Sequence, residues 1–167
     1  YQFVWHEFCD WYLEMIKPAL SADALEGDRM RQRVVLMRVY ETILALGHPF
    51  VPFLTEELWH ALPGERGLLY DRPFPVVDPS ATDVNVEEDM AHLMEVIRAV
   101  RNIRSELNIP PAKKVEVRLK GQPEELAFLR EHEEIVRRLA RAGSVAYVDP
   151  DYIPVQDATA VVNDIEV

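Results

Sequence analysis

The chain has 167 residues, of which 49% are hydrophobic and 28% charged, a globular composition with enough length for one ordinary domain or two small ones. Its formal net charge of −11 argues against binding nucleic acid through overall basicity. A single cysteine, Cys9, excludes an internal disulfide framework and fits a reducing compartment, and the apolar runs are shorter than the roughly 18 residues of a membrane helix.

The first predicted helix is rich in aromatic residues. It runs from about residue 2 to Ile16 and ends before Pro18. Because the chain begins inside this helix and has no initiator Met, we expect it to be a fragment of a larger protein. A helix with so many aromatic side chains needs packing partners on more than one side, so we expect three of them in the core: Trp5, Phe8 and Trp11.

A second helix, predicted for residues 28–46, leads into a corner that spans residues 47–59. Gly47 suits a left-handed cap after the helix, and Pro49 cannot continue it. Pro52 has the fixed φ of a first helical turn, so a third helix is predicted for residues 52–61. We expect the aromatic residues of this corner in the core: Phe50, Phe53 and Trp59.

A Pro- and Gly-rich segment, residues 63–84, is predicted to be a long ordered loop. A fourth helix follows at residues 86–107, with Asp83 or Asn85 as its N-cap, and it ends abruptly at Pro110-Pro111. Its apolar stripe contains Leu93, Val96, Ile97, Val100, Ile103 and Leu107, at the spacing of an α-helix.

The remaining residues change character. Residues 115–119 alternate apolar and charged side chains, the period of a half-buried strand. Residues 123–142 are predicted to be helical, residues 145–148 a second strand, and residues 159–167 a hairpin around Asn163-Asp164. The predicted fold class is therefore mainly α, with a helical bundle (residues 1–84) followed by a long helix and a small α/β module of β-α-β-β order (residues 85–167).

The sequence contains no recognisable catalytic constellation. Its five histidines lack the spacing of metal ligands, and one cysteine cannot build a thiolate zinc site. A phosphate-binding glycine loop, a nucleophile elbow and a dinucleotide fingerprint are all missing from the sequence. We interpret Glu56-Glu57 and Glu133-Glu134 as charges on helix surfaces.

Residues 98–120 form a local basic stretch within this acidic chain, with seven basic residues against two acidic ones. Arg101, Arg104 and Asn108 share one flank of the fourth helix, where guanidinium groups could grip successive phosphates or stack on bases. Two other interpretations remain open. The stretch could be a solvated surface, or Arg101 and Arg104 could pair with acidic residues of the bundle and hold the two halves together.

Three segments, taken together, resemble signatures of valyl-tRNA synthetases: Trp5–Glu14 with Lys17, His48–Trp59, and Arg101–Pro111. Isoleucyl and leucyl enzymes have looser versions of the first two. All three, in this order and at this spacing, cover most of residues 4–114. One departure is Gly47, where the family usually has a bulky apolar residue.

This resemblance implies the helical anticodon-binding domain of a class I aminoacyl-tRNA synthetase, followed by a small α/β module that ends before a coiled-coil arm. The family's ATP-binding signatures are absent from this sequence, so the fragment is expected to hold no cofactor and to activate no valine, whereas the parent enzyme uses ATP with Mg. The implied partners are the tRNA(Val) anticodon stem-loop and the catalytic and editing domains of the parent chain. The implied location is cytoplasmic, away from the membrane.

Seven residues are the candidates for tRNA contact: Arg29, Arg33, Arg101, Arg104, Asn108, Lys113 and Lys114. The first two begin the second helix in line with Leu36 and Tyr40, where they could project at the end of the bundle. The alternative function is an acidic helical scaffold that binds another protein and has no RNA binding of its own, which the charge of −11 favours.

Overall fold

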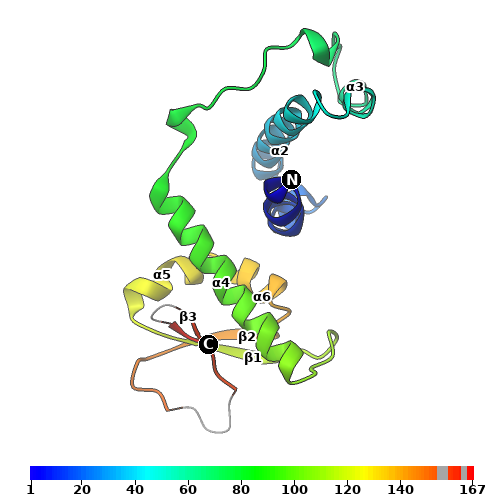
Figure 1. Ribbon diagram of the computed structural model, residues 1–167. Coiled ribbons are helices and arrows are strands. Elements are labelled where there is room, and N and C mark those ends of the chain that lie inside the picture. Colours follow the sequence, from blue (N-terminus) through cyan, green and yellow to red (C-terminus); the bar gives the residue numbers. More distant parts are fainter. Residues whose placement is uncertain (154–157, 163–164) are drawn as a thin grey trace. The chain divides into compact units, whose positions relative to one another are not determined.

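The computed structural model describes residues 1–153, 158–162 and 165–167, and it divides them into two compact units, Tyr1–Pro79 and Ser80–Val167 (Figure 1). The boundary lies within a 3-10 turn, η4 (Pro79–Ala81), a few residues before the 84/85 boundary predicted from the sequence.

The first unit is helical. Its elements in chain order are η1 (Phe3–Tyr12), α1 (Leu13–Ile16), η2 (Pro18–Leu20), α2 (Glu26–Gly47), α3 (Pro52–His60) and η3 (Leu69–Asp71). The first of these is a π-helix rather than the expected α-helix, and the Leu13 N–H donates to the carbonyl of Phe8, five residues back. Helical geometry tightens to α only over α1.

The corner between α2 and α3 is built around Trp59. Leu44, Trp59 and Leu69 form a buried apolar cluster, and Tyr40 and Leu58 pack against it. The indole N–H of Trp59 donates to the carbonyl of Gly67 at 2.9 Å, which fastens the following loop over the cluster. The core of this corner therefore consists of one face of each helix and the η3 turn.

Three of the six aromatic residues predicted in the core are exposed. Phe8, Trp11 and Trp59 are buried, as expected, but Trp5, Phe50 and Phe53 expose 55%, 85% and 92% of their surface. On α3, Thr55 and Trp59 lie one turn apart and face the cluster. Phe53 is about 200° away from Thr55 around the helix, so its ring points outward. Of the three aromatic residues predicted in the core of this corner, only Trp59, which lies on the inner face of α3, is buried.

The predicted left-handed cap at Gly47 is also wrong. Gly47 is the last residue of α2, its φ is not positive, and His48 after it remains helical with φ −56°. The chain reverses because the N–H groups of Phe50 and Val51 both donate to the carbonyl of Gly47, at 3.0 and 3.1 Å. Hydrogen bonding at the corner, rather than the conformational freedom of glycine, ends this helix.

The second unit contains α4 (Val84–Glu106), β1 (Glu116–Lys120), α5 (Pro123–Glu131), α6 (Glu133–Leu139), β2 (Ser144–Val148), β3 (Val161–Val162) and β4 (Ile165–Glu166). Of the two predicted caps, Asp83 is the one used: its carboxylate accepts from the N–H groups of Asn85 and Val86. The helix predicted for residues 123–142 is interrupted at His132, which has φ −107° and ψ 23°.

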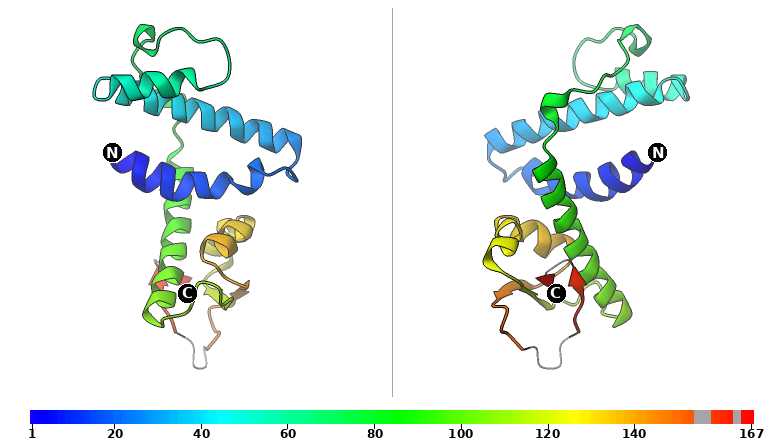
Figure 2. Two further views of the ribbon diagram at one scale, coloured as in Figure 1. Left: turned by 90° about the vertical axis from the view of Figure 1, so that its right-hand side faces the viewer. Right: turned by 60° about the vertical axis from the view of Figure 1, so that its left-hand side comes forward.

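The four strands form one mixed sheet with the order β2-β1-β4-β3. Strands β1 and β2 are parallel, while β4 is antiparallel to both β1 and β3. The predicted β-α-β-β order is confirmed, although the turn at Asn163-Asp164 lies outside the described residues. Figure 2 shows α4, α5 and α6 gathered around this sheet.

Only one face of the sheet belongs to the core of this unit. Val117, Leu119 and Ile165 are buried on that face, together with residues of all three helices. Because side chains alternate along a strand, Arg118, Lys120 and Glu166 lie on the other face. There, the Lys120 ammonium pairs with the Glu166 carboxylate at 3.0 Å.

Candidate nucleic-acid interface

Arg104, one of the predicted RNA contacts, is buried within the second unit, with 6% of its surface exposed. Its guanidinium donates to the carbonyls of Lys113 at 2.9 Å, Pro110 at 3.1 Å and Arg141 at 3.4 Å. No carboxylate among the described residues pairs with it. Its hydrogen bonds hold together the end of α4, the loop that follows and the end of α6.

Two helix ends meet at this guanidinium, and each is capped by a left-handed residue. Asn108 after α4 has φ 51°, and Arg141 after α6 has φ 56°. In both caps the next N–H reaches back five residues at 2.8 Å: Ile109 to Arg104, and Ala142 to Arg137. This conformation costs roughly 1–2 kcal/mol for a residue that carries a Cβ, least for Asn.

The loop after α4 and the loop after α6 also touch directly. The N–H of Gly143 donates to the carbonyl of Val115 at 2.7 Å. A Cβ at Gly143 would lie 3.1 Å from the Cβ of Lys114, so glycine permits this close approach. Lys113 and Lys114 are therefore neighbours of the residues that end α6, and both of them are exposed.

Arg101, one turn before Arg104, ties α4 to α6. Its Nε donates to the carbonyl of Leu139, the last residue of α6, at 2.9 Å. The structure thus brings five predicted residues together at one end of the second unit: Arg101, Arg104, Asn108, Lys113 and Lys114. The alternative interpretation, in which Arg104 pairs with acidic residues of the bundle, is wrong, because Arg104 donates to carbonyls within its own unit.

The other two candidates lie in the first unit. The Arg29 guanidinium pairs with Glu26 and also donates to the carbonyls of Ser21 and Ala22, each at 3.4 Å. Arg33, one turn later on α2, is exposed, and no polar partner holds it within the described part of the chain. Arg29 therefore braces the entry to α2, whereas the Arg33 side chain is free to meet a ligand.

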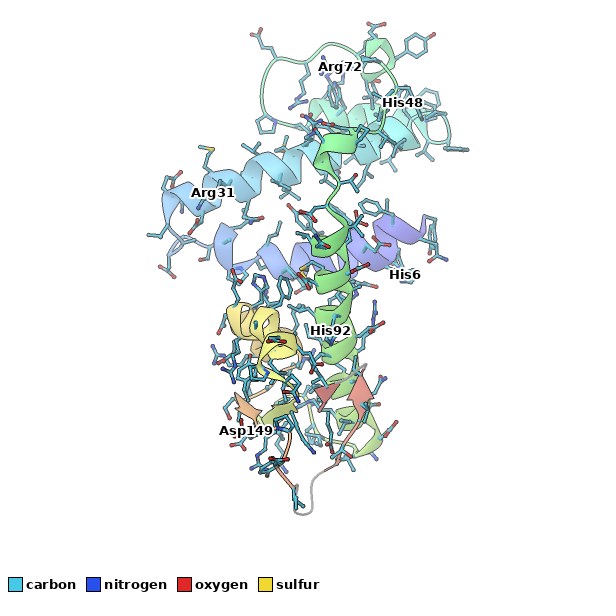
Figure 3. All side chains as sticks on the ribbon, turned by 90° about the vertical axis from the view of Figure 1, so that its left-hand side faces the viewer. His6, Arg31, His48, Arg72, His92 and Asp149 are labelled. Carbon is cyan, nitrogen blue, oxygen red and sulfur yellow. The ribbon has the colours of Figure 1, made fainter. Side chains whose placement is uncertain are left out.

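Polar groups of the α2–α3 corner serve its packing. The Nδ1 of His48 lies 2.8 Å from the Thr55 hydroxyl, and the Glu56 carboxylate accepts the N–H of Leu69 at 2.8 Å. Arg66 and Arg72 stack over Trp59, at 4.5 and 5.7 Å from its ring. Figure 3 labels His48 and Arg72, which belong to this corner.

Within residues 1–153, 158–162 and 165–167, no group of three or more His, Cys, Asp or Glu side chains is placed to hold a metal ion. In the same residues no helix is long and apolar enough to cross a bilayer. A cavity of about 400 Å³ in the second unit is lined by residues of α4, of the loop that follows it and of the strands. Its lining is mostly aliphatic, including Val100, Ile103 and Leu107, with Arg118 and Lys120 among its polar residues.

One tyrosine of the second unit has a strongly shifted pKa. Burial, followed by the charge of Glu133, raises the pKa of Tyr147 to about 12, while Arg130 acts in the opposite direction. The neutral phenol donates to the carbonyl of Leu129 at 2.9 Å, which ties β2 to α5. This tyrosine is a structural group rather than a candidate acid or base.

Sequence reasoning missed Arg141. It lies outside the basic stretch of residues 98–120 and enters the cluster only because α6 ends beside the loop after α4. A signal was nevertheless present, because residues 135–148 contain three arginines and no acidic residue. The roles of the seven predicted residues in RNA contact remain predictions.

Comparison with known proteins gives a consistent result. A family model described as the anticodon-binding domain of tRNA ligase matches residues 1–119. The valine–tRNA ligase of Desulfotalea psychrophila is 41% identical over the whole chain, and so is that of Bacillus subtilis. The valine–tRNA ligase of Zymomonas mobilis is 42% identical over 87% of the chain. The chain spans 19%, 19% and 17% of the lengths of these three relatives.

Proposed function

This chain belongs to the anticodon-binding domain family of tRNA ligases, and on that premise we propose that it docks the anticodon stem-loop of tRNA(Val). The observation that carries the proposal is the family match over residues 1–119, together with relatives that are valine–tRNA ligases. In the parent enzyme this docking would hold the tRNA while its distant acceptor end reaches the catalytic and editing domains. The parent would then use ATP with Mg to attach valine, in the cytoplasm.

The exposed cations of both units are the proposed contacts. Arg33 on α2 and the pair Lys113 and Lys114 after α4 have charged ends that no described residue pairs. Such groups neutralise phosphates and release counterions, which gives affinity in spite of the net charge of −11. Unpaired loop bases would be read on their edges by shorter polar groups such as Asn108.

Arg29, Arg101 and Arg104 take a supporting part in this proposal. Each of them donates to backbone carbonyls, so each fixes the backbone from which the exposed cations project. Arg104 in particular acts on RNA binding through Lys113, whose carbonyl it holds at 2.9 Å. Replacing one of these supporting arginines would lower the affinity for RNA indirectly, because the exposed cations would be displaced.

A titration of the chain with a fluorescent hairpin of the tRNA(Val) anticodon arm tests the proposal. We expect binding that weakens steeply with salt, and weaker binding to a hairpin with the same stem and a scrambled loop. In the parent ligase, Lys113→Ala with Lys114→Ala should raise KM for tRNA and leave valine-dependent pyrophosphate exchange unchanged. A chain that shows no binding at low salt, or an unchanged KM in the double variant, would contradict the proposal.

A second candidate function is the acidic protein-binding scaffold, and one observation favours it. Phe50 and Phe53 expose 85% and 92% of their surface at the corner between α2 and α3, and large exposed aromatics are typical of protein interfaces. The hairpin titration separates the two functions. Under the scaffold hypothesis, the anticodon hairpin and an unrelated hairpin bind equally poorly at every salt concentration.

A further inference from the structure

We propose that Arg141 is an RNA-backbone contact, and that it forms with Lys113 and Lys114 a phosphate-binding site at the junction of two loops. The proposal rests on the tRNA-binding function above and adds a residue and a contact chemistry to it. Four observations carry it: the backbone conformation of Arg141, its free side chain, its neighbours and the local charge.

The backbone at Arg141 favours a different residue. With φ 56° it occupies the left-handed position after α6, where glycine and, less often, asparagine are the usual residues. The matching position after α4 does hold an asparagine, Asn108. Since the cap would be more stable with glycine, the packing of α6 does not explain an arginine there. Strain at one residue points to a role for its side chain.

That side chain has no structural use among the described residues. Arg141 is exposed, and only its backbone N–H and carbonyl make hydrogen bonds. Other arginines of this unit are engaged: Arg137 with Glu134 at 2.9 Å, and Arg130 over the Tyr147 ring at 4.8 Å. The Arg141 guanidinium is therefore available to a ligand.

The two exposed lysines are held beside it. The buried guanidinium of Arg104 donates to the carbonyls of both Lys113 and Arg141, at 2.9 and 3.4 Å, so these two backbones converge on one group. Lys114 abuts Gly143, two residues after Arg141. Three free cations thus project from two loops whose backbones are fixed by direct hydrogen bonds, as a preorganised site requires.

The charged side chains of the two loops are all basic. Residues 107–115 and 135–148 contain no acidic residue, and the buried Arg104 adds a charge that no described carboxylate neutralises. Guanidinium groups bind phosphate oxygens in a bidentate manner, and lysines act as point charges. No exposed aromatic side chain, which could stack on a base, belongs to these two loops. The site would therefore bind phosphates of the RNA backbone and would not recognise bases.

Arg141→Gly separates this role from a structural one, because the two interpretations predict opposite results. In the hairpin titration we expect affinity to fall about five- to tenfold. The slope of log affinity against log salt should become shallower by about 1, the value for one lost phosphate contact. The preference for the correct anticodon loop should remain. Relief of backbone strain should keep the urea midpoint at or above that of the unchanged chain.

Two further variants complete the test. Arg141→Asn, which also tolerates the left-handed conformation, should reproduce the loss of affinity. Arg137→Ala removes an equal charge one turn away, from a residue already paired with Glu134, and should leave affinity within about twofold. Unchanged affinity and salt slope in Arg141→Gly would overturn this inference alone. A lack of hairpin binding by the unchanged chain would instead overturn the function on which it rests.

Discussion

Arg104 of α4 donates to the carbonyl of Arg141 at 3.4 Å and so holds the residue that ends α6. The two residues are 37 positions apart in the chain, and their contact joins the two helix ends of the second unit. A buried arginine is usually paired with a carboxylate. Here it is satisfied by three backbone carbonyls, two in the loop after α4 and one just beyond the end of α6.

We predict from this contact that Arg104→Met destabilises the chain. The substitution leaves the carbonyls of Lys113, Pro110 and Arg141 without their donor, at a cost of about 2–4 kcal/mol. Urea unfolding monitored by circular dichroism would measure the change. Lys113→Ala, at an exposed position, serves as control and should stay within about 0.5 kcal/mol. Equal stability of the two variants would show that Arg104 is not a brace.

A second prediction concerns the α2–α3 corner. Trp59→Phe removes the N–H that donates to Gly67 at 2.9 Å and weakens the stacking of Arg66. We therefore expect the free energy of unfolding to fall by about 1–3 kcal/mol. The loop at residues 63–72 should then be cut faster in limited proteolysis. Trp5→Phe is the matched control, because the Trp5 side chain is more than half exposed and should contribute little to stability. The idea fails if both variants unfold alike.

A third prediction follows from the same corner. Gly47→Ala should stabilise the chain by about 0.5–1 kcal/mol, because Gly47 is helical and alanine is the better helix former. The added Cβ would lie 3.5 Å from the methyl carbon of Thr55, an ordinary van der Waals distance. Thermal unfolding would report the gain as a higher Tm. A lower Tm would mean that the corner needs glycine after all.

The fourth prediction is a dependence of stability on alkaline pH. Since burial raises the pKa of Tyr147 from 10.0 to about 12, the folded state favours the neutral phenol. The resulting stabilisation is complete below pH 10 and is lost as pH rises through about 12. Tyr147→Phe should cost about 1 kcal/mol at neutral pH through the lost bond to Leu129, and should flatten this decline.

Urea unfolding at a series of pH values compares the two chains, and a spectroscopic titration of tyrosinate identifies the group. The chain has six tyrosines, so the difference between the two titrations isolates Tyr147. Identical pH profiles for both chains would assign the alkaline decline to another group.

Local sequence patterns were sufficient for most of the elements. Helices predicted at residues 28–46, 52–61 and 86–107 are observed at Glu26–Gly47, Pro52–His60 and Val84–Glu106. The alternation at residues 115–119 likewise marks β1 (Glu116–Lys120). These predictions rest on periodicity, proline and caps, all of which act between residues a few positions apart. The family resemblance drawn from three sequence segments is confirmed by the match over residues 1–119.

The placement of individual side chains required the tertiary structure. The sequence by itself determined that Phe53 is aromatic and helical and that Arg104 lies on a basic flank. It did not determine that the Phe53 ring points to solvent or that the Arg104 guanidinium is buried among carbonyls. Those outcomes depend on where chain reversals bring distant backbone together. Arg141 joins Lys113 and Lys114 for the same reason, because a cluster formed across the fold leaves no periodic pattern in the chain.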